Sequence, residues 1–209
     1  LIVLGVSAGA FPLRNGPEYL LGLGWFVLTL HLVLWFRSQV RAAALVLPPV
    51  ALLLALSAYL FSVGDIQAGV LANQGWFIFH TSIATAGVGA LTVSFAMSLL
   101  FLVKESALKS KRSMRVLEML PTLEALDRVG FHALLCGFPL LTLGIITGAI
   151  WAEMAWGSYW GWDPKETWSL ITWFVYAALV HARLTVGWRG RKAAWASIGG
   201  VHPGLFPLP

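Results

Sequence analysis

The chain has 209 residues, of which 58% are hydrophobic and only 11% are charged. A soluble domain normally carries charge on about a quarter of its residues, so this composition excludes an ordinary soluble protein. It indicates an integral membrane protein in contact with lipid. The formal net charge of +5 does not predict a nucleic-acid partner, because Lys and Arg in membrane proteins mark the cytoplasmic ends of spans.

The chain begins at Leu1 in an apolar stretch, so we interpret residues 1–10 as the end of a span and the sequence as a fragment. A helix needs about 20 apolar residues to cross a bilayer, and five later runs qualify. Backbone polar groups in lipid must pair within their own segment, so these runs are predicted helices. The expected fold is an all-α polytopic transmembrane helix bundle with five full spans and a partial N-terminal one. The five runs are Tyr19–Phe36, Ala42–Val63, Phe77–Val103, Val129–Trp151 and Trp168–Trp188.

The spans are expected to form one membrane domain over residues 1–196. Residues 197–209 form an atypical tail, rich in Gly and Pro and too short to cross a bilayer. The single cysteine, Cys136, lies inside an apolar run. It excludes a disulfide framework and is expected to be a small core or lipid-facing residue.

Basic residues alternate with the predicted spans. Arg37 and Arg41 separate the first two, and clusters of Lys and Arg follow the third and the fifth. Residues 64–76 contain no Lys or Arg, and the segment 151–168 contains only Lys165. The positive-inside rule therefore places segment 151–168 outside, facing the periplasm of a bacterial inner (cytoplasmic) membrane or the lumen of a thylakoid-like membrane.

The stretch Trp151–Trp173 holds six of the eleven tryptophans. Indoles offer broad flat faces, each with one N–H that needs a partner, so this stretch suits a flat, mostly apolar ligand such as a porphyrin. An aromatic belt at the membrane interface is the alternative, and it fits Trp151 and Trp168. The candidate ligand-binding aromatics are Trp156, Tyr159, Trp160 and Trp162.

The sequence Asp163-Pro164-Lys165-Glu166 predicts that the fifth helix begins at Pro164. Asp suits the N-cap, Pro suits the first position, and Glu at the third can accept the N–H of the cap. Capping alone is a sufficient explanation of Asp163 and Glu166. It is also compatible with a role in ligand binding, because a cap fixes the geometry of the preceding loop.

Histidines in spans are costly and usually functional, and neutral imidazole is a standard axial ligand of haem iron. His80 is predicted near the outer end of its span, beside segment 151–168. His181 follows Pro164 by 17 residues, hence by about 25 Å along the helix, so two depths imply two sites. Snorkelling beside Arg183 is the alternative for His181. No ligand role is assigned to His31, His132 and His202.

The motif WGSYWGWDPKETWSLITW resembles the tryptophan-rich WWD signature of the cytochrome c assembly protein family, in its CcsA/ResC-type system II branch. The resemblance extends along the chain up to Ala196. It implies a membrane component of c-type cytochrome biogenesis that works with a CcsB/ResB-type membrane partner. Together they carry haem b to the outer face and attach it to the CxxCH thiols of apocytochrome c.

The resemblance also implies site residues. His80 matches one of two outer histidines that ligate the haem iron, and His181 matches a histidine within a span that is implicated in an inner haem site. In the family the second outer histidine follows a further span that is absent from this sequence, and His202 does not take its role. The loop residues that match are Trp156, Trp160, Trp162 and Asp163.

No nucleophile–base pair is evident in the sequence. The chain is therefore expected to position and shield its substrate within a haem lyase complex, without a conventional catalytic residue. One alternative is a cytochrome b-like haem-bearing electron-transfer subunit, which predicts paired histidines that face each other within the spans. The other is a transporter or structural subunit whose tryptophans only anchor the membrane interface.

Overall fold

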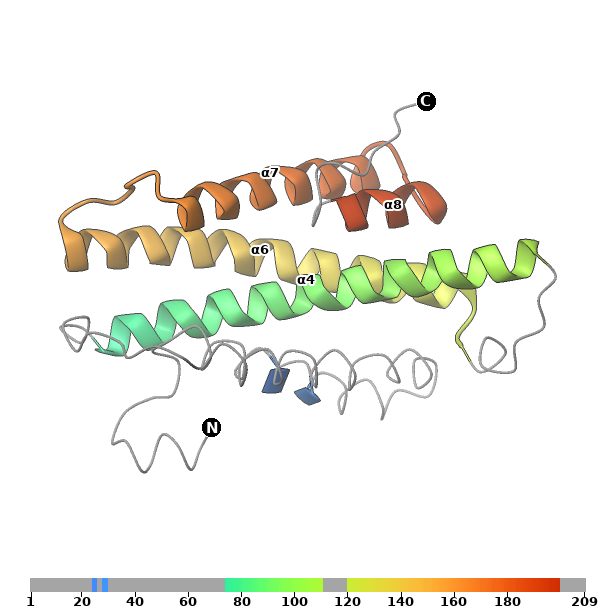
Figure 1. The fold of residues 1–209 in the computed structure, drawn as a ribbon, viewed down its shortest axis with the longest axis horizontal. Coiled ribbons are helices and arrows are strands. Elements are labelled where there is room, and N and C mark those ends of the chain that lie inside the picture. Colours follow the sequence, from blue (N-terminus) through green and yellow to red (C-terminus); the bar gives the residue numbers. More distant parts are fainter. Residues whose placement is uncertain (1–23, 26–27, 30–73, 111–119, 200–209) are drawn as a thin grey trace.

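A computed structural model describes residues 24–25, 28–29, 74–110 and 120–199. The main elements of this part are the helices α4 (Gln74–Lys109), α6 (Leu123–Trp156), α7 (Pro164–Leu184) and α8 (Arg191–Gly199). The first three run antiparallel in turn, so the start of α4, the end of α6 and the start of α7 lie at one end of the molecule (Figure 1). We call this the aromatic end and the opposite one the polar end.

The all-helical prediction is confirmed for the described residues, which contain no strand. Two helices, residues 75–109 of α4 and the whole of α6, are long and apolar enough to cross a membrane. Both extend beyond the predicted runs Phe77–Val103 and Val129–Trp151. The two earlier runs and residues 1–10 lie almost wholly outside the described part of the chain.

Helix α7 begins at Pro164, as its capping sequence predicts. The Asp163 side chain caps it, because Oδ1 accepts the backbone N–H of Glu166 at 2.8 Å. The predicted partner of Glu166 is wrong. Its carboxylate accepts the N–H of Gly161 at 2.7 Å instead of the N–H of the cap. The left-handed backbone of Trp162 (φ 56°) turns the chain over the first turn of α7 and brings Gly161 within reach.

Glycines allow α4 and α6 to pack closely. Gly130, Gly137 and Gly144 recur every seven residues on α6 and so lie on one face of it. A Cβ at Gly144 would lie 3.2 Å from the Cα of Ala84, and one at Gly87 would lie 2.8 Å from the Leu141 nitrogen. Small residues at such contacts let helix backbones approach in membrane proteins. The close approach fixes the register of α4 against α6.

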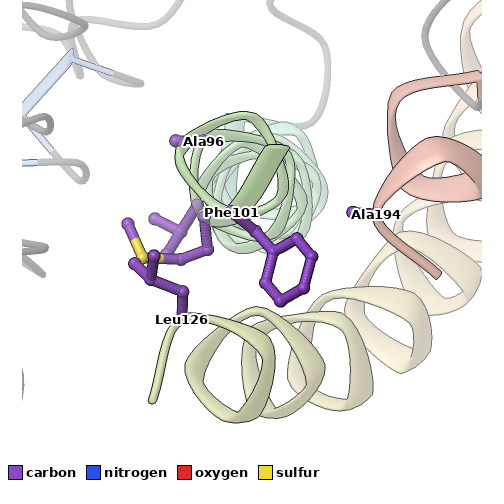
Figure 2. Packing of buried hydrophobic residues seen from close by; sticks show 6 residues of the cluster. Ala96, Phe101, Leu126 and Ala194 are labelled. Atoms are coloured by element: carbon purple, nitrogen blue, oxygen red, sulfur yellow. The ribbon is translucent and has the colours of Figure 1, made fainter. Parts of the chain in front are cut away.

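A buried cluster joins α4, α6 and α8 towards the polar end (Figure 2). Met97 and Phe101 of α4 pack with Leu126 of α6 and Ala194 of α8, and Met97 is fully buried. Helix α8 was not predicted from the sequence, and it continues past residue 196, where the tail was expected to begin. Its small buried residues fit closely against α4.

Helix α7 contacts α6 through a narrow stripe. Its buried residues are Tyr176 and Leu179, which pack in one cluster with Leu141 of α6. Trp173 adds a polar contact, because its Nε1 donates to Thr142 Oγ1 at 2.9 Å. The stripe orients α7 and thereby sets the direction in which the chain leaves the aromatic end.

Candidate functional site

The connection between α6 and α7, residues 157–163, is held at both ends by hydrogen bonds that its backbone N–H groups donate. Gly157 ends α6 in the left-handed conformation (φ 73°), and its N–H donates to the carbonyl oxygen of Glu153 at 2.8 Å. At the other end Glu166 accepts the N–H of Gly161. Because both ends are held in this way, the backbone of residues 157–163 forms a fixed frame from which the side chains of the connection project.

Most of the predicted ligand-binding aromatics are exposed, either on this connection or at the adjoining end of α6. The exposed fractions are 62% for Trp156, 59% for Tyr159 and 70% for Trp162. Trp160 is half-buried, and its ring meets the ring of Trp162 edge to face at 5.9 Å between centroids. Among the described residues, the Trp160 Nε1–H has no hydrogen-bond partner. The connection therefore presents wide apolar ring faces, whereas the unpaired Trp160 N–H is buried.

A series of ring contacts joins this connection to α4. The ring of Trp151 lies 5.4 Å from that of Phe77 and 4.8 Å from that of Trp156. Trp151 is only 8% exposed, so it belongs to the interior and not to an interface belt. Trp168 is 58% exposed, which the belt interpretation predicts. Phe77 and Trp151 thus hold Trp156 at the edge of the helix pair.

His80 lies on α4 one turn after Trp76 and faces α6. Its Nδ1 is 3.2 Å from Thr147 Oγ1, while the Trp76 Nε1–H donates to the Thr147 carbonyl oxygen at 3.1 Å. The ring packs on Gly148, where an added Cβ would lie 2.7 Å from His80 Cε1. The sequence placed His80 at this end but missed Thr147 and Gly148. A Thr-Gly pair within an otherwise apolar helix is the signal that would have found them.

His181 lies at the polar end. It is exposed in the last turn of α7, and its carbonyl oxygen accepts the N–H of Thr185 at 2.9 Å. Its position 17 residues after Pro164 corresponds to about 25 Å along the helix. The structure does not bring His80 and His181 together.

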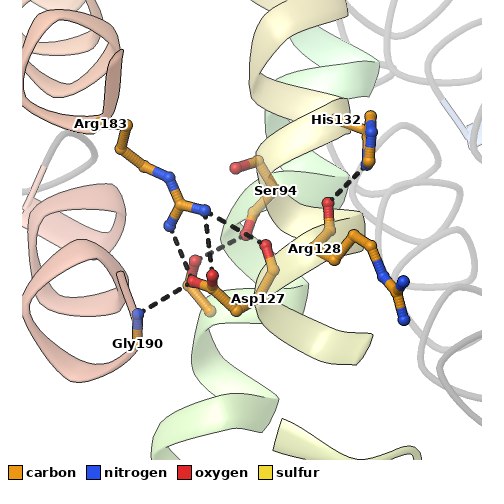
Figure 3. A network of polar contacts seen from close by, with 7 residues as sticks. Ser94, Asp127, Arg128, His132, Arg183 and Gly190 are labelled. Carbon is orange, nitrogen blue, oxygen red and sulfur yellow. Dashed lines mark hydrogen bonds and ion pairs between the residues drawn. The ribbon is translucent and has the colours of Figure 1, made fainter. Parts of the chain in front are cut away.

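A network of polar contacts closes the polar end (Figure 3). Arg183, whose side chain is 8% exposed, donates to both carboxylate oxygens of Asp127 at 2.7 and 3.1 Å. The N–H of Gly190 donates to the same carboxylate at 3.1 Å, and the guanidinium lies 4.5 Å from the Phe131 ring centroid. These groups satisfy one another, so the network is structural. Sequence reasoning missed it and considered Arg183 as one of the basic residues after the fifth span and as a neighbour of His181.

Within the described ranges, no three His, Cys, Asp or Glu side chains are grouped to hold a metal ion. His132 is exposed, its Nδ1 donates to the carbonyl oxygen of Arg128 at 2.8 Å, and it lies on the side of α6 away from Arg183 (Figure 3). Cys136 is also exposed. The described residues thus offer one histidine at the same end as the exposed aromatic rings.

These features define a class of protein, namely an α-helical protein with membrane-length helices and an aromatic surface at the same end as a histidine. Residues 13–202 match the family described as cytochrome C assembly protein. The chain is similar to proteins named "Cytochrome c biogenesis protein CcsA". The one from Trieres chinensis is 39% identical over 97% of this chain and 74% of the relative. Those from Microcystis aeruginosa and Synechocystis sp. are 35% and 33% identical, each over 93% of this chain and over 74% and 75% of the relative.

The chain therefore belongs to the cytochrome c assembly protein family, as its WWD resemblance implies. Membership and the two apolar helices together identify it as a membrane protein.

Proposed function

We propose that this chain is a membrane component of c-type cytochrome biogenesis that carries haem b to the outer face and presents it to apocytochrome c. Family membership supports the role in cytochrome c maturation. The observation that carries the finer proposal is the exposure of Trp156, Tyr159 and Trp162 on a fixed backbone at the same end as His80. Flat aromatic faces bind a macrocycle through dispersion and stacking, and imidazole supplies an axial ligand to its iron.

Each aromatic-end residue has a separate task in this proposal. The indoles of Trp156, Trp160 and Trp162 grip the macrocycle and leave its vinyl edge open to the client. His80 holds the iron until a histidine of the client replaces an axial ligand. Asp163 contributes by capping α7, which fixes the frame of the connection.

Attachment then needs little covalent chemistry from this chain. Each client thiol adds its sulfur to one vinyl carbon and its hydrogen to the other, so no atom leaves and no oxidant or reductant is consumed. The chain accelerates the addition by holding the partners in position and excluding water. It thus acts in a haem lyase complex without a conventional catalytic residue.

A separate inner site is proposed at His181. The exposed ring in the last turn of α7 is accessible to a haem held jointly with a histidine of a CcsB/ResB-type membrane partner. The basic residues of the sequence favour the polar end as the inner one. Haem would enter there and pass to the aromatic end, across a bacterial inner or thylakoid-like membrane.

Haem titration of the purified protein tests the two sites. We expect His80→Ala and His181→Ala each to lower the haem content, since each removes one ligand. His132→Ala is the matched control, because His132 bonds a carbonyl oxygen of its own helix, and its haem content should equal that of the unsubstituted protein. Unchanged haem in both of the first two variants would overturn the two-site proposal.

Haem transfer separates this function from that of a cytochrome b-like electron-transfer subunit. Of the three described histidines, His80 lies at the aromatic end, and His132 and His181 lie towards the polar end with exposed side chains, which does not favour an inward-facing pair. With apocytochrome c and a partner protein present, we expect haem to move from this chain to the CxxCH client. A reversible haem that stays bound in stoichiometric amount would favour the electron-transfer subunit.

A further inference from the structure

We infer that Thr147 is a positioning residue that determines which nitrogen of His80 faces the haem. The inference rests on the function proposed above. A neutral imidazole carries its proton on Nδ1 or on Nε2, and only the other nitrogen has the lone pair that binds iron. A ligand histidine therefore needs a partner that selects one tautomer.

The direction of the His80–Thr147 hydrogen bond follows from the other partners of Thr147. Its hydroxyl has one proton, which it donates to the carbonyl oxygen of Leu143 at 2.7 Å, with that of Gly144 at 3.2 Å as a second acceptor. Thr147 Oγ1 is then left with lone pairs only. We therefore assign the donor role in this contact to His80 Nδ1, which lies 3.2 Å away, so Nε2 carries the lone pair.

Two further contacts hold the ring in place. A Cβ at Gly148 would lie 2.7 Å from His80 Cε1, so the ring reaches its position because residue 148 has no side chain. Trp76 precedes His80 by four residues and so shares its face of α4, and it donates to the Thr147 carbonyl oxygen. Thr147 thus binds α4 through both its side chain and its backbone.

The acceptor is a neutral hydroxyl, which has a chemical consequence. Outer partners of metal-bound histidines fix the ring and raise its basicity, and carboxylates are common among them. A hydroxyl orients the ring without adding negative charge. His80 is therefore an oriented ligand of ordinary strength, which suits a haem that has to be handed on.

The direct test titrates haem into the purified Thr147→Val protein. Valine keeps the volume and removes the acceptor, so we expect haem affinity to fall about fivefold, the effect of one neutral hydrogen bond. The ferric EPR spectrum should show mixed axial ligation. Thr147→Ser should restore both measurements. Thr92→Val is the matched control, because Thr92 Oγ1 donates to the Val88 carbonyl oxygen within α4, and it should change neither.

A second test compares two ligands within each protein, so a loss of folded protein in a Thr147→Val variant cancels from the result. In His80→Gly the missing ring is supplied as imidazole, which has an N–H for Thr147, or as 1-methylimidazole, which has none. We expect the affinity ratio of imidazole to 1-methylimidazole to be about fivefold higher in His80→Gly than in His80→Gly/Thr147→Val. An equal ratio in both proteins overturns the inference.

The outcomes separate the inference from the function on which it rests. If His80→Ala binds haem with unchanged affinity and spectrum, His80 is no ligand and the proposed outer site fails. If haem binding depends on His80 but is unchanged by Thr147→Val, only the positioning role of Thr147 fails.

Discussion

The two ends of the helix assembly differ in how their side chains are used: those at the polar end are paired with one another, whereas several at the aromatic end are exposed. At the polar end Asp127 accepts from Arg183 and from the Gly190 N–H, and the buried guanidinium has its charge matched. At the aromatic end both ends of the connection are hydrogen-bonded, but Tyr159 and Trp162 expose most of their rings. The polar end is built for stability. The aromatic end has a fixed connection, and its exposed side chains are available to bind a ligand.

The largest expected effect on stability comes from a substitution at the polar end. Asp127→Ala leaves the Arg183 charge buried without its partner, which should lower the free energy of unfolding by about 3 kcal/mol or more. Thermal unfolding in detergent measures the loss. Arg191→Ala is the control, because Arg191 is 59% exposed and lies 3.8 Å from Glu105, so it should cost less than about 1 kcal/mol. An equal loss of unfolding free energy in the two variants would contradict the stabilising role of the buried Arg183–Asp127 pair.

The next largest effect concerns the contact between the His80 ring of α4 and Gly148 of α6. Gly148→Ala places a Cβ 2.7 Å from the His80 ring, and such overpacking should destabilise the protein by about 1–3 kcal/mol. Haem affinity should fall as well, because the ring is displaced. Gly75→Ala is the control, since a Cβ there meets no atom within 4 Å. Haem affinity that is equal in the two variants would exclude a constraint on the ring from residue 148.

A smaller effect tests the frame of the connection. Asp163→Ala removes the cap of α7 and should lower the free energy of unfolding by about 1 kcal/mol, with a matching fall in haem content. Asp163→Asn keeps an oxygen acceptor, so stability and haem content should stay close to those of the unsubstituted protein. Loss of haem in the Asn variant without loss of stability would instead give the carboxylate charge a direct role in binding.

An effect on stability of similar size, seen only between two variants of one residue, is expected at Trp162. Its left-handed backbone (φ 56°) is unfavourable for any residue with a Cβ, so Trp162→Gly should be about 1 kcal/mol more stable than Trp162→Ala. Both variants should hold less haem than the unsubstituted protein, since each lacks the exposed indole. Full haem content in both would remove Trp162 from the proposed binding surface.

Local chemistry was predictable from the sequence, whereas long-range pairing was not. The start of α7 at Pro164 follows from neighbouring residues, because a cap and its helix are adjacent in the chain. The His80–Thr147 and Arg183–Asp127 contacts join residues 67 and 56 positions apart. Only the packing of α4, α6 and α7 determines which polar residues meet. The spacing of apolar residues within one helix does not specify how far that helix is shifted along its neighbour.

The Arg183–Asp127 network also has a mechanical consequence. Pro164 lies 19 residues from Arg183, about 28 Å along α7, and the side-chain contacts described above between α7 and α6 begin at Trp173. The network and these contacts together anchor α7 from Trp173 to Arg183, so the lever arm is the first part of the helix, about 14 Å from Pro164 to Trp173. A tilt of about 5° at Trp173 moves the start of α7, and with it the end of the connection that bears Trp162, by about 1.2 Å.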